Sequence, residues 1–155
     1  MRRYIAATLI ALTIGIATPA SAKWNWQGPC DGWRYGETVT QETPRLKVET
    51  RMKRLIVCAF DRYAPGNTSK ALYVAGRESG YWPWAINQAY DDAHDCIGLF
   101  QMMRQYWPSR VKAYLLAGWY PAADWPYISA KNPHANAIAA AKMVKAGGWG
   151  PWSTA

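Results

Sequence analysis

The sequence has few histidines and, after residue 17, no long apolar run. These two shortages argue against a metal site and against a membrane-spanning segment. Only two histidines occur among its 155 residues, His94 and His134, and neither has a zinc-binding spacing with a cysteine. After residue 17 no segment approaches the roughly 20 apolar residues that cross a bilayer. We therefore expect no metal site and no stable membrane insertion of the chain beyond that point.

Clusters of like charge are also scarce. Basic residues outnumber acidic ones by 18 to 10, which gives a formal net charge of +8, but only Arg51, Lys53 and Arg54 form a tight basic group. Such an excess attracts a protein to anionic polymers in general. Because the other basic residues are scattered, we expect no nucleic-acid partner.

Phenylalanine is nearly absent, whereas the other aromatic residues are abundant. The chain has ten Trp and ten Tyr against two Phe. Trp and Tyr combine a flat apolar face with a polar edge, so they stack on sugar rings while tolerating water. A small domain also needs bulky side chains to bury enough area, which accounts for many of these rings. The excess favours a carbohydrate-binding groove.

The first 22 residues have the organisation of a secretory signal peptide. Arg2 and Arg3 precede an apolar run at 5–17, and small residues then follow in an Ala-x-Ala pattern that ends at Ala22. The run is too short to span a bilayer, and Pro19 interrupts it. We predict cleavage after Ala22 and a secreted or cell-envelope product, one domain in size.

Three cysteines remain in the exported part, and an odd number cannot pair completely. For Cys30, Cys58 and Cys96 an oxidising compartment predicts one disulfide plus a free thiol, or an intermolecular bridge. Three pairings are open, and the sequence does not choose among them.

We expect residues 23–45, which are polar, Trp-rich and turn-prone, to form an irregular arm, and residues 46–155 to form one mainly α-helical domain. Its first helix follows Pro44 and ends near Pro65-Gly66. Six apolar residues recur there at helical spacing: Val48, Met52, Leu55, Ile56, Ala59 and Phe60.

A second helix follows directly. Asn67 or Thr68 can cap its start, and Gly80 can close it in the left-handed conformation. A long loop comes next, and the only candidate β-hairpin lies in it, at 87–97. Three further helices are predicted, at about 98–106, 108–118 and 133–146.

Glu78 is the candidate catalytic residue, in the last turn of the second helix. The negative carbonyl end of a helix disfavours an ionised carboxylate, and burial beside Tyr81 and Trp82 acts in the same direction. A carboxylic acid that stays protonated near neutral pH is what glycosidic cleavage requires. The alternative is a surface carboxylate paired with Arg77 or Lys70, and position alone does not exclude it.

Four short motifs follow one another along the chain. They are Glu78-Ser79 with Pro83 and Ala85 after it, Gly98-Leu99-Phe100-Gln101, Asn132-Pro133-His134-Ala135-Asn136-Ala137, and Gly147-Gly148-Trp149-Gly150-Pro151-Trp152. In these the sequence resembles the soluble lytic transglycosylase superfamily, including its small exported actinobacterial and phage lysozyme-like domains. The resemblance covers about residues 46–152. It implies a lysozyme-like helical fold that cuts the β-1,4 bond between N-acetylmuramic acid and N-acetylglucosamine in peptidoglycan.

The resemblance makes Glu78 the general acid and later the base. It places four side chains beside the substrate: Ser79, Phe100, Gln101 and Trp149. Gln101 is expected to hydrogen-bond an N-acetyl or hydroxyl group, Trp149 could instead pack beneath the last helix, and Asn136 is expected to cap or brace that helix. No cofactor is needed, the partner is the peptidoglycan glycan strand, and we expect a monomer.

The chain departs from the family in two places. The loop before Gly98 is acidic, with Asp91, Asp92 and Asp95, and no Ala-Tyr-Asn-Ala-Gly segment occurs near the end. We expect these aspartates to form a solvated loop, so that a single acid acts and the N-acetyl and 6-hydroxyl groups of the sugar complete the reaction to give an anhydro sugar. If one of them faces Glu78 across the bond, two carboxylates can hydrolyse it.

Two non-enzymatic functions remain as alternatives. A cell-wall glycan-binding module would keep the sugar groove without needing the acid, so the Glu78-Ser79 pair favours an enzyme. A scaffold or adhesin would use the Trp-rich arm, with Trp24, Trp26 and Trp33, for protein contacts.

Overall fold

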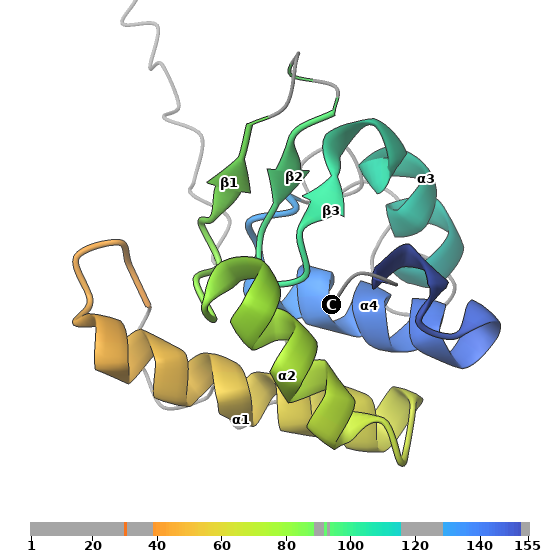
Figure 1. Ribbon diagram of the computed structural model, residues 1–155, viewed down its shortest axis with the longest axis horizontal. Helices are drawn as coiled ribbons and strands as arrows, with labels where there is room; N and C mark the ends of the chain where they lie inside the picture. Colours follow the sequence, from red (N-terminus) through yellow and green to blue (C-terminus); the bar gives the residue numbers. More distant parts are fainter. Residues whose placement is uncertain (1–29, 31–38, 89–91, 93, 116–128, 153–155) are drawn as a thin grey trace, which may run out of the picture.

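In its described residues the computed structural model contains four α-helices and a small three-stranded sheet (Figure 1). It describes residues 30, 39–88, 92, 94–115 and 129–152. The predicted signal peptide with its cleavage after Ala22, and the arm up to residue 38 apart from Cys30, lie outside the described residues. No helix in the described ranges is long and apolar enough to cross a membrane.

The mainly α-helical class predicted from the sequence is confirmed. The helices are α1 at Arg45–Tyr63, α2 at Thr68–Ser79, α3 at Trp107–Arg110 and α4 at Pro133–Gly147. A π-helical segment, Val111–Leu115, continues α3, and short 3-10 turns lie at Arg104–Tyr106 and Gly150–Trp152. The predicted helix at 108–118 thus begins one residue earlier, and its last three residues lie outside the described ranges.

The helix ends follow the sequence signals with one exception. The chain leaves α1 through Gly66, at φ +84°, and α2 closes on Gly80, at φ +57°, as the left-handed cap predicts. Asn67 occupies the position before α2, but its side chain makes no capping hydrogen bond. Its Oδ1 instead accepts a hydrogen bond from Nε1 of Trp149 at 2.9 Å, so it ties α2 to the end of the chain.

The predicted hairpin exists and has a third strand. β1 at Ile86–Asn87 pairs with β2 at Cys96–Ile97, and β2 pairs with β3 at Met102–Met103, all antiparallel. The predicted helix at 98–106 is therefore wrong. Gly98 and Gln101 have φ values of +82° and +46°, which no right-handed helix accepts, and the chain between them turns back into β3.

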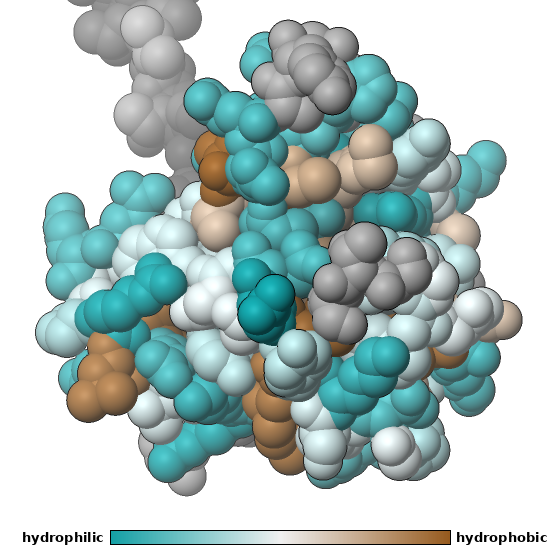
Figure 2. Space-filling model, viewed as in Figure 1, coloured by the Kyte–Doolittle hydropathy of each residue, from teal (hydrophilic) through white to brown (hydrophobic). Residues whose placement is uncertain are grey.

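The core lies between α1 and α4, with α2 and the 98–101 turn closing it. Its largest fully buried side chains include Phe60, Phe100, Met52, Leu55 and Ile56. Figure 1 shows α4 between α1 on one side and the α3 region on the other, with the sheet beyond the end of α2. On the face drawn in Figure 2 polar residues predominate and apolar ones are scattered.

One disulfide forms, between Cys30 and Cys58 on α1, and Cys96 on β2 is a free thiol. The predicted disulfide is confirmed, and the structure selects Cys30–Cys58 among the three pairings. The bridge anchors a point of the amino-terminal arm to α1.

Candidate active site at the end of α2

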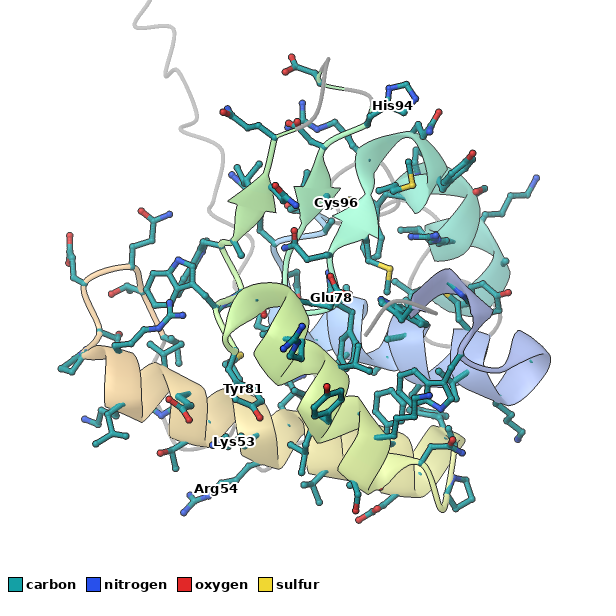
Figure 3. All side chains as sticks on the ribbon, in the orientation of Figure 1. Lys53, Arg54, Glu78, Tyr81, His94 and Cys96 are labelled. Atoms are coloured by element: carbon teal, nitrogen blue, oxygen red, sulfur yellow. A yellow bond between two sulfur atoms is a disulfide. The ribbon has the colours of Figure 1, made fainter. Side chains whose placement is uncertain are left out.

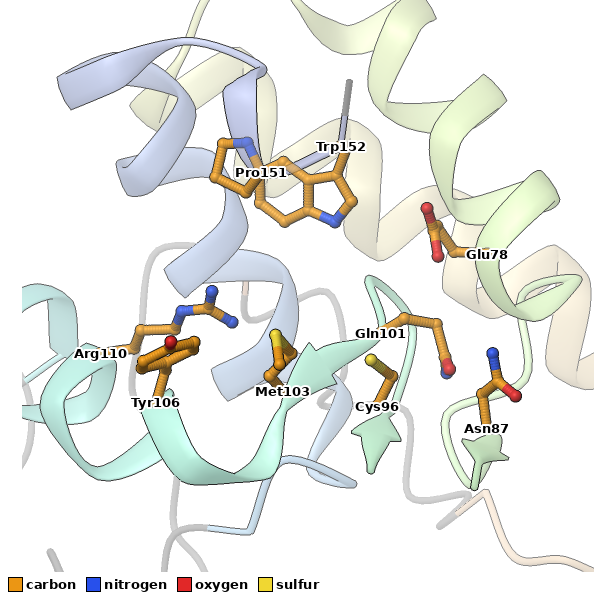
Figure 4. Close-up of a pocket in the computed structure, with 9 residues that line it drawn as sticks. All are labelled: Glu78, Asn87, Cys96, Gln101, Met103, Tyr106, Arg110, Pro151 and Trp152. Atoms are coloured by element: carbon orange, nitrogen blue, oxygen red, sulfur yellow. The ribbon is translucent and has the colours of Figure 1, made fainter. Parts of the chain in front are cut away.

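A pocket of about 400 Å³ opens between the end of α2, the sheet and the carboxyl-terminal turn (Figure 4). Nine residues line it: Glu78, Asn87, Cys96, Gln101, Met103, Tyr106, Arg110, Pro151 and Trp152. They come from five separate parts of the chain, so the pocket exists only in the folded protein. It holds one acid, one guanidinium, two amides, a thiol and two aromatic rings.

Glu78 lies in the last turn of α2, at the edge of the pocket (Figures 3 and 4). It is partly buried, and this burial raises the pKa of its carboxyl above the ordinary value. Among the described residues it forms no salt bridge, and Lys70 instead lies over the ring of Trp149 at 5.3 Å. The surface pair with Arg77 or Lys70 is therefore not formed. A carboxyl in this state can donate a proton.

Arg45, on α1, fixes the end of α2 next to Glu78. Its Nη2 donates to the carbonyl oxygens of Gly80 at 3.0 Å and Ser79 at 3.4 Å, which have no partners further along the helix. The same guanidinium lies 4.4 Å from the centre of the Trp82 ring. These contacts define where the turn that carries Glu78 stops.

Ser79 connects α2 to the turn at 98–101. Its hydroxyl lies 2.9 Å from the carbonyl oxygen of Leu99 and 3.1 Å from that of Ala75, and one proton can serve either. Ser79 does not line the pocket. The contact instead sets the distance between Glu78 on the helix and Gln101 on the turn.

Asn136, on α4, holds the same turn from the opposite side. It is fully buried; its Oδ1 accepts from the backbone N–H of Phe100 at 3.0 Å, and its Nδ2 donates to the carbonyls of Ile97 at 3.1 Å and Ala130 at 2.8 Å. A structural role for Asn136 was expected, and the structure shows that it braces the turn against α4. A Cβ on Gly98 would lie only 2.3 Å from the carbonyl oxygen of Ala130, which explains the glycine.

Gln101 brings an unused acceptor into the pocket. It is 9% exposed, and its Nε2 donates to the carbonyl oxygen of Gly98 at 2.9 Å. Its Oε1 is buried and has no hydrogen-bond partner in the described part of the chain. Figure 4 shows this amide between Glu78 and Asn87. Since a buried acceptor without a donor is costly, a ligand N–H or O–H at this point would bind favourably.

Phe100 and Trp149 do not line the pocket. Phe100 is fully buried, and its ring centre lies 5.5 Å from that of Phe60 and 5.9 Å from that of Trp152. Trp149 stacks on Phe60 at 5.8 Å. Of the five residues predicted for the site, the structure thus brings Glu78 and Gln101 together in the pocket and uses the other three to support it.

Several pocket residues escaped the sequence reasoning. Trp152 lines the pocket in place of Trp149, with its Nε1 bonded to the carbonyl oxygen of Phe100 at 2.8 Å. The motif contains two tryptophans three residues apart, so the sequence offered Trp152 as well as Trp149 as a candidate pocket residue. Tyr106, the last residue of the 3-10 turn, and Arg110, the last residue of α3, stand four residues apart, but the sequence analysis predicted a break between two helices at 107, which concealed that spacing.

The acidic loop is directed elsewhere. Asp92 is exposed, whereas Asp95 is only 4% exposed, and its Oδ2 lies 3.1 Å from Nη2 of Arg104. The expectation of a solvated loop is therefore wrong for Asp95, because an ion pair holds it between β2 and the residue after β3. Asp91 lies outside the described residues. Among the described pocket residues Glu78 is the only acid.

In the described ranges no group of three or more His, Cys, Asp and Glu side chains is placed to hold a metal ion. No family model, no curated protein and no solved structure matches the chain. The site therefore has to be interpreted from its own geometry together with the motif pattern.

Proposed function

We propose that this protein cleaves the glycan strands of bacterial peptidoglycan, at the β-1,4 bond between N-acetylmuramic acid and N-acetylglucosamine. The observation that carries the proposal is the state of Glu78: a partly buried carboxyl with a raised pKa and no ion-pair partner in the described structure, at the edge of a pocket. The motif resemblance of Glu78-Ser79 and Gly98–Gln101 to lytic transglycosylases agrees with that state.

The rest of the pocket suits a sugar carrying an N-acetyl group. The rings of Trp152 and Tyr106 offer aromatic surface on which a pyranose can pack, and the unpaired Oε1 of Gln101 can accept an amide N–H or a hydroxyl. Asn87, exposed on β1, adds a second amide at the rim. Bound sugar would displace water from Glu78 and raise its pKa further, which favours the protonated form.

In the proposed reaction Glu78 gives its proton to the glycosidic oxygen as the bond to C1 breaks. The carbonyl oxygen of the 2-acetamido group stabilises C1 from within the sugar. The 6-hydroxyl oxygen then attacks C1, and its proton returns to the Glu78 carboxylate. The product is a 1,6-anhydro sugar, water is not consumed, and the acid ends as it began.

The single acid in the described pocket favours this internal route over hydrolysis with two carboxylates. A second carboxyl about 5 to 9.5 Å away would be needed for the hydrolytic mechanisms. Asp95 is committed to Arg104, and Asp92 pairs with the same arginine at 3.8 Å. We therefore expect a lytic transglycosylase, and a muramidase becomes the conclusion if reducing ends appear.

The test is digestion of purified peptidoglycan by the protein and by Glu78→Gln, with the released fragments weighed by mass spectrometry. Loss of a general acid should lower the rate by about 10²- to 10⁴-fold. Glu42→Gln makes the same change at an exposed position away from the pocket and should act like the unsubstituted protein.

Fragments that end in anhydromuramic acid, each lighter by one water than a hydrolysed end, support the proposal when Glu78→Gln fails to release them. If neither protein releases fragments while both bind the wall, the protein is a glycan-binding module instead. Equal release by both proteins would assign the chemistry to another residue.

A further inference from the structure

Arg110 lies across the pocket from Glu78 and carries a charge that the proposed reaction does not use (Figure 4). It stands in the last turn of α3, and its side chain is partly buried. Among the described residues it forms no salt bridge. Arg104, on the same segment, shows the contrast, because it pairs with Asp95 at 3.1 Å.

The contacts that Arg110 does make are weak. Its Nη1 donates to the thioether sulfur of Met102 at 3.2 Å, and its guanidinium lies 5.7 Å from the centre of the Tyr106 ring. A thioether is a poor acceptor, and a guanidinium has five N–H donors in a planar fork. Most of this donor capacity remains available on the pocket side.

The surroundings of Arg110 favour an anion. Burial lowers the pKa of its guanidinium, which still stays charged at any physiological pH, so its desolvation has to be offset by a negative partner. The titratable groups that face it are Cys96, Tyr106 and Tyr114. The Cys96 thiol interacts with both Glu78 and Arg110, which places it between the acid and the cation.

We propose that Arg110 binds a carboxylate on the N-acetylmuramic acid residue of the substrate, across the pocket from the bond that Glu78 cleaves. This assignment rests on the proposed function. N-acetylmuramic acid carries its lactyl group and peptide stem on C3 of the ring whose C1 bond is cleaved, whereas N-acetylglucosamine is neutral. A planar guanidinium matches a carboxylate in a two-point interaction. The pocket then selects peptidoglycan over uncharged N-acetylglucosamine polymers.

Two kinds of carboxylate on the substrate have the chemistry that Arg110 would bind, and three test ligands distinguish between them. A peptide-bearing disaccharide offers the free carboxylates of the stem, whereas a peptide-free disaccharide offers the lactyl carboxylate. A chitooligosaccharide of matched length offers neither. Dissociation constants are measured by titration calorimetry for all three, in a Glu78→Gln background that prevents turnover.

In that background Arg110→Gln should weaken binding of a carboxylate-bearing ligand roughly tenfold, as loss of a charge-assisted hydrogen-bonded pair predicts. Binding of the chitooligosaccharide should stay within about twofold, because no carboxylate is involved. The control is Lys112→Gln. This substitution also removes one positive charge, but Lys112 is an exposed residue outside the pocket, two positions along the chain from Arg110. The ligand that shows the loss identifies the carboxylate.

A ligand whose carboxylates have been converted to amides provides a second measurement on the Arg110-containing protein, independent of how Arg110→Gln folds. The amidated ligand should bind about tenfold more weakly than the unmodified one, the same factor as for Arg110→Gln. If amidation changes nothing, or if Arg110→Gln weakens all three ligands equally, the carboxylate site is refuted while the glycosidase proposal stands. If none of the three glycans binds, the proposed function itself fails, and this assignment fails with it.

Discussion

Asn136 and Gln101 are both buried amides that contact the 98–101 turn, yet only one of them is fully hydrogen-bonded. Asn136 is 0% exposed, and its oxygen and nitrogen together bond three backbone groups. Gln101 is 9% exposed, and its nitrogen bonds Gly98 while its oxygen bonds no described group. The fold uses both polar atoms of the Asn136 amide, whereas the Gln101 amide oxygen has no described partner and is the acceptor that we propose a ligand uses.

The same division separates the two arginines of the neighbouring segment. Arg104 closes the hairpin through Asp95, both by its side chain and by its backbone N–H to the Asp95 carbonyl at 2.8 Å. Arg110 faces the pocket without a carboxylate among the described residues. Polar groups that have hydrogen-bond or ion-pair partners thus form the frame of the pocket, and those without a described partner line the surface that we propose as the binding site. Substitutions on the two sides should therefore have different consequences.

The largest effect is expected when the frame loses Asn136. Asn136→Ala leaves the Phe100 N–H and two carbonyls without partners in the core, so the free energy of unfolding should fall by about 3 to 5 kcal/mol. Urea denaturation followed by tryptophan fluorescence measures it. Asn132→Ala removes a helix cap that accepts from His134 and Ala135 and should cost only about 1 kcal/mol. Similar losses in the two variants would contradict the bracing role.

Gly98 tests the other contact of the frame. An alanine there would bring its Cβ 2.3 Å from the Ala130 carbonyl oxygen and 2.4 Å from Nδ2 of Asn136, at a φ of +82°. We expect Gly98→Ala to lower the melting temperature by an amount that corresponds to about 2 to 4 kcal/mol. Gly147→Ala, near the end of α4 with open space around it, should be neutral or stabilising by up to about 1 kcal/mol. A Gly98→Ala variant as stable as the parent would show that the turn can shift.

Gln101 should respond in the opposite way to Asn136. Gln101→Met removes the free acceptor, so binding of an N-acetylated glycan should weaken about three- to tenfold by calorimetry. Stability should change by less than about 1 kcal/mol, because the lost bond to Gly98 is offset by removal of an unpaired buried oxygen. Gln105→Met makes the same change at an exposed position and should alter neither quantity. A large loss of stability with unchanged binding would assign Gln101 to the frame.

Most of the helices could be predicted from the sequence because the patterns that indicate them are local. The buried residues of α1 recur at helical spacing, and Pro-Gly or Asn-Pro pairs mark helix ends. The 98–106 segment misled the prediction. Its apolar residues resemble a helix, but the left-handed φ of Gln101 and the pairing of β3 with β2 depend on contacts that lie far apart in the sequence.

The site was accessible in part for the same reason. The motif located Glu78 and the turn with Gln101, but no local signal says on which side of that turn a side chain lies, so Phe100 was placed in the groove instead of the core. Arg110 enters the pocket only because β3 and the 3-10 turn after it direct α3 there. Residues brought to a site by nonlocal pairing are those that sequence reasoning misses.

The smallest expected effect is the pH dependence that Glu78 gives to activity and to the free energy of unfolding. Burial raises the pKa of Glu78 in the folded protein, so the protonated acid is favoured and activity should fall as pH rises through that raised value. Stability has the same sign: the contribution of Glu78 is fully present below its unfolded pKa and is lost as pH rises through the folded one. Because the side chain is only partly buried, solvent screens the effect, and that loss should be only roughly a few tenths of a kcal/mol.

Urea denaturation of the parent and Glu78→Gln at several pH values measures this term as a difference. The two proteins should be equally stable in strong acid, and Glu78→Gln should become slightly the more stable as the pH rises, because glutamine cannot ionise. A parent that gains stability relative to Glu78→Gln with rising pH would mean that its carboxylate is stabilised in the fold. Glu78 would then belong with Asn136 and Arg104 in the frame, and the pocket would lose its acid.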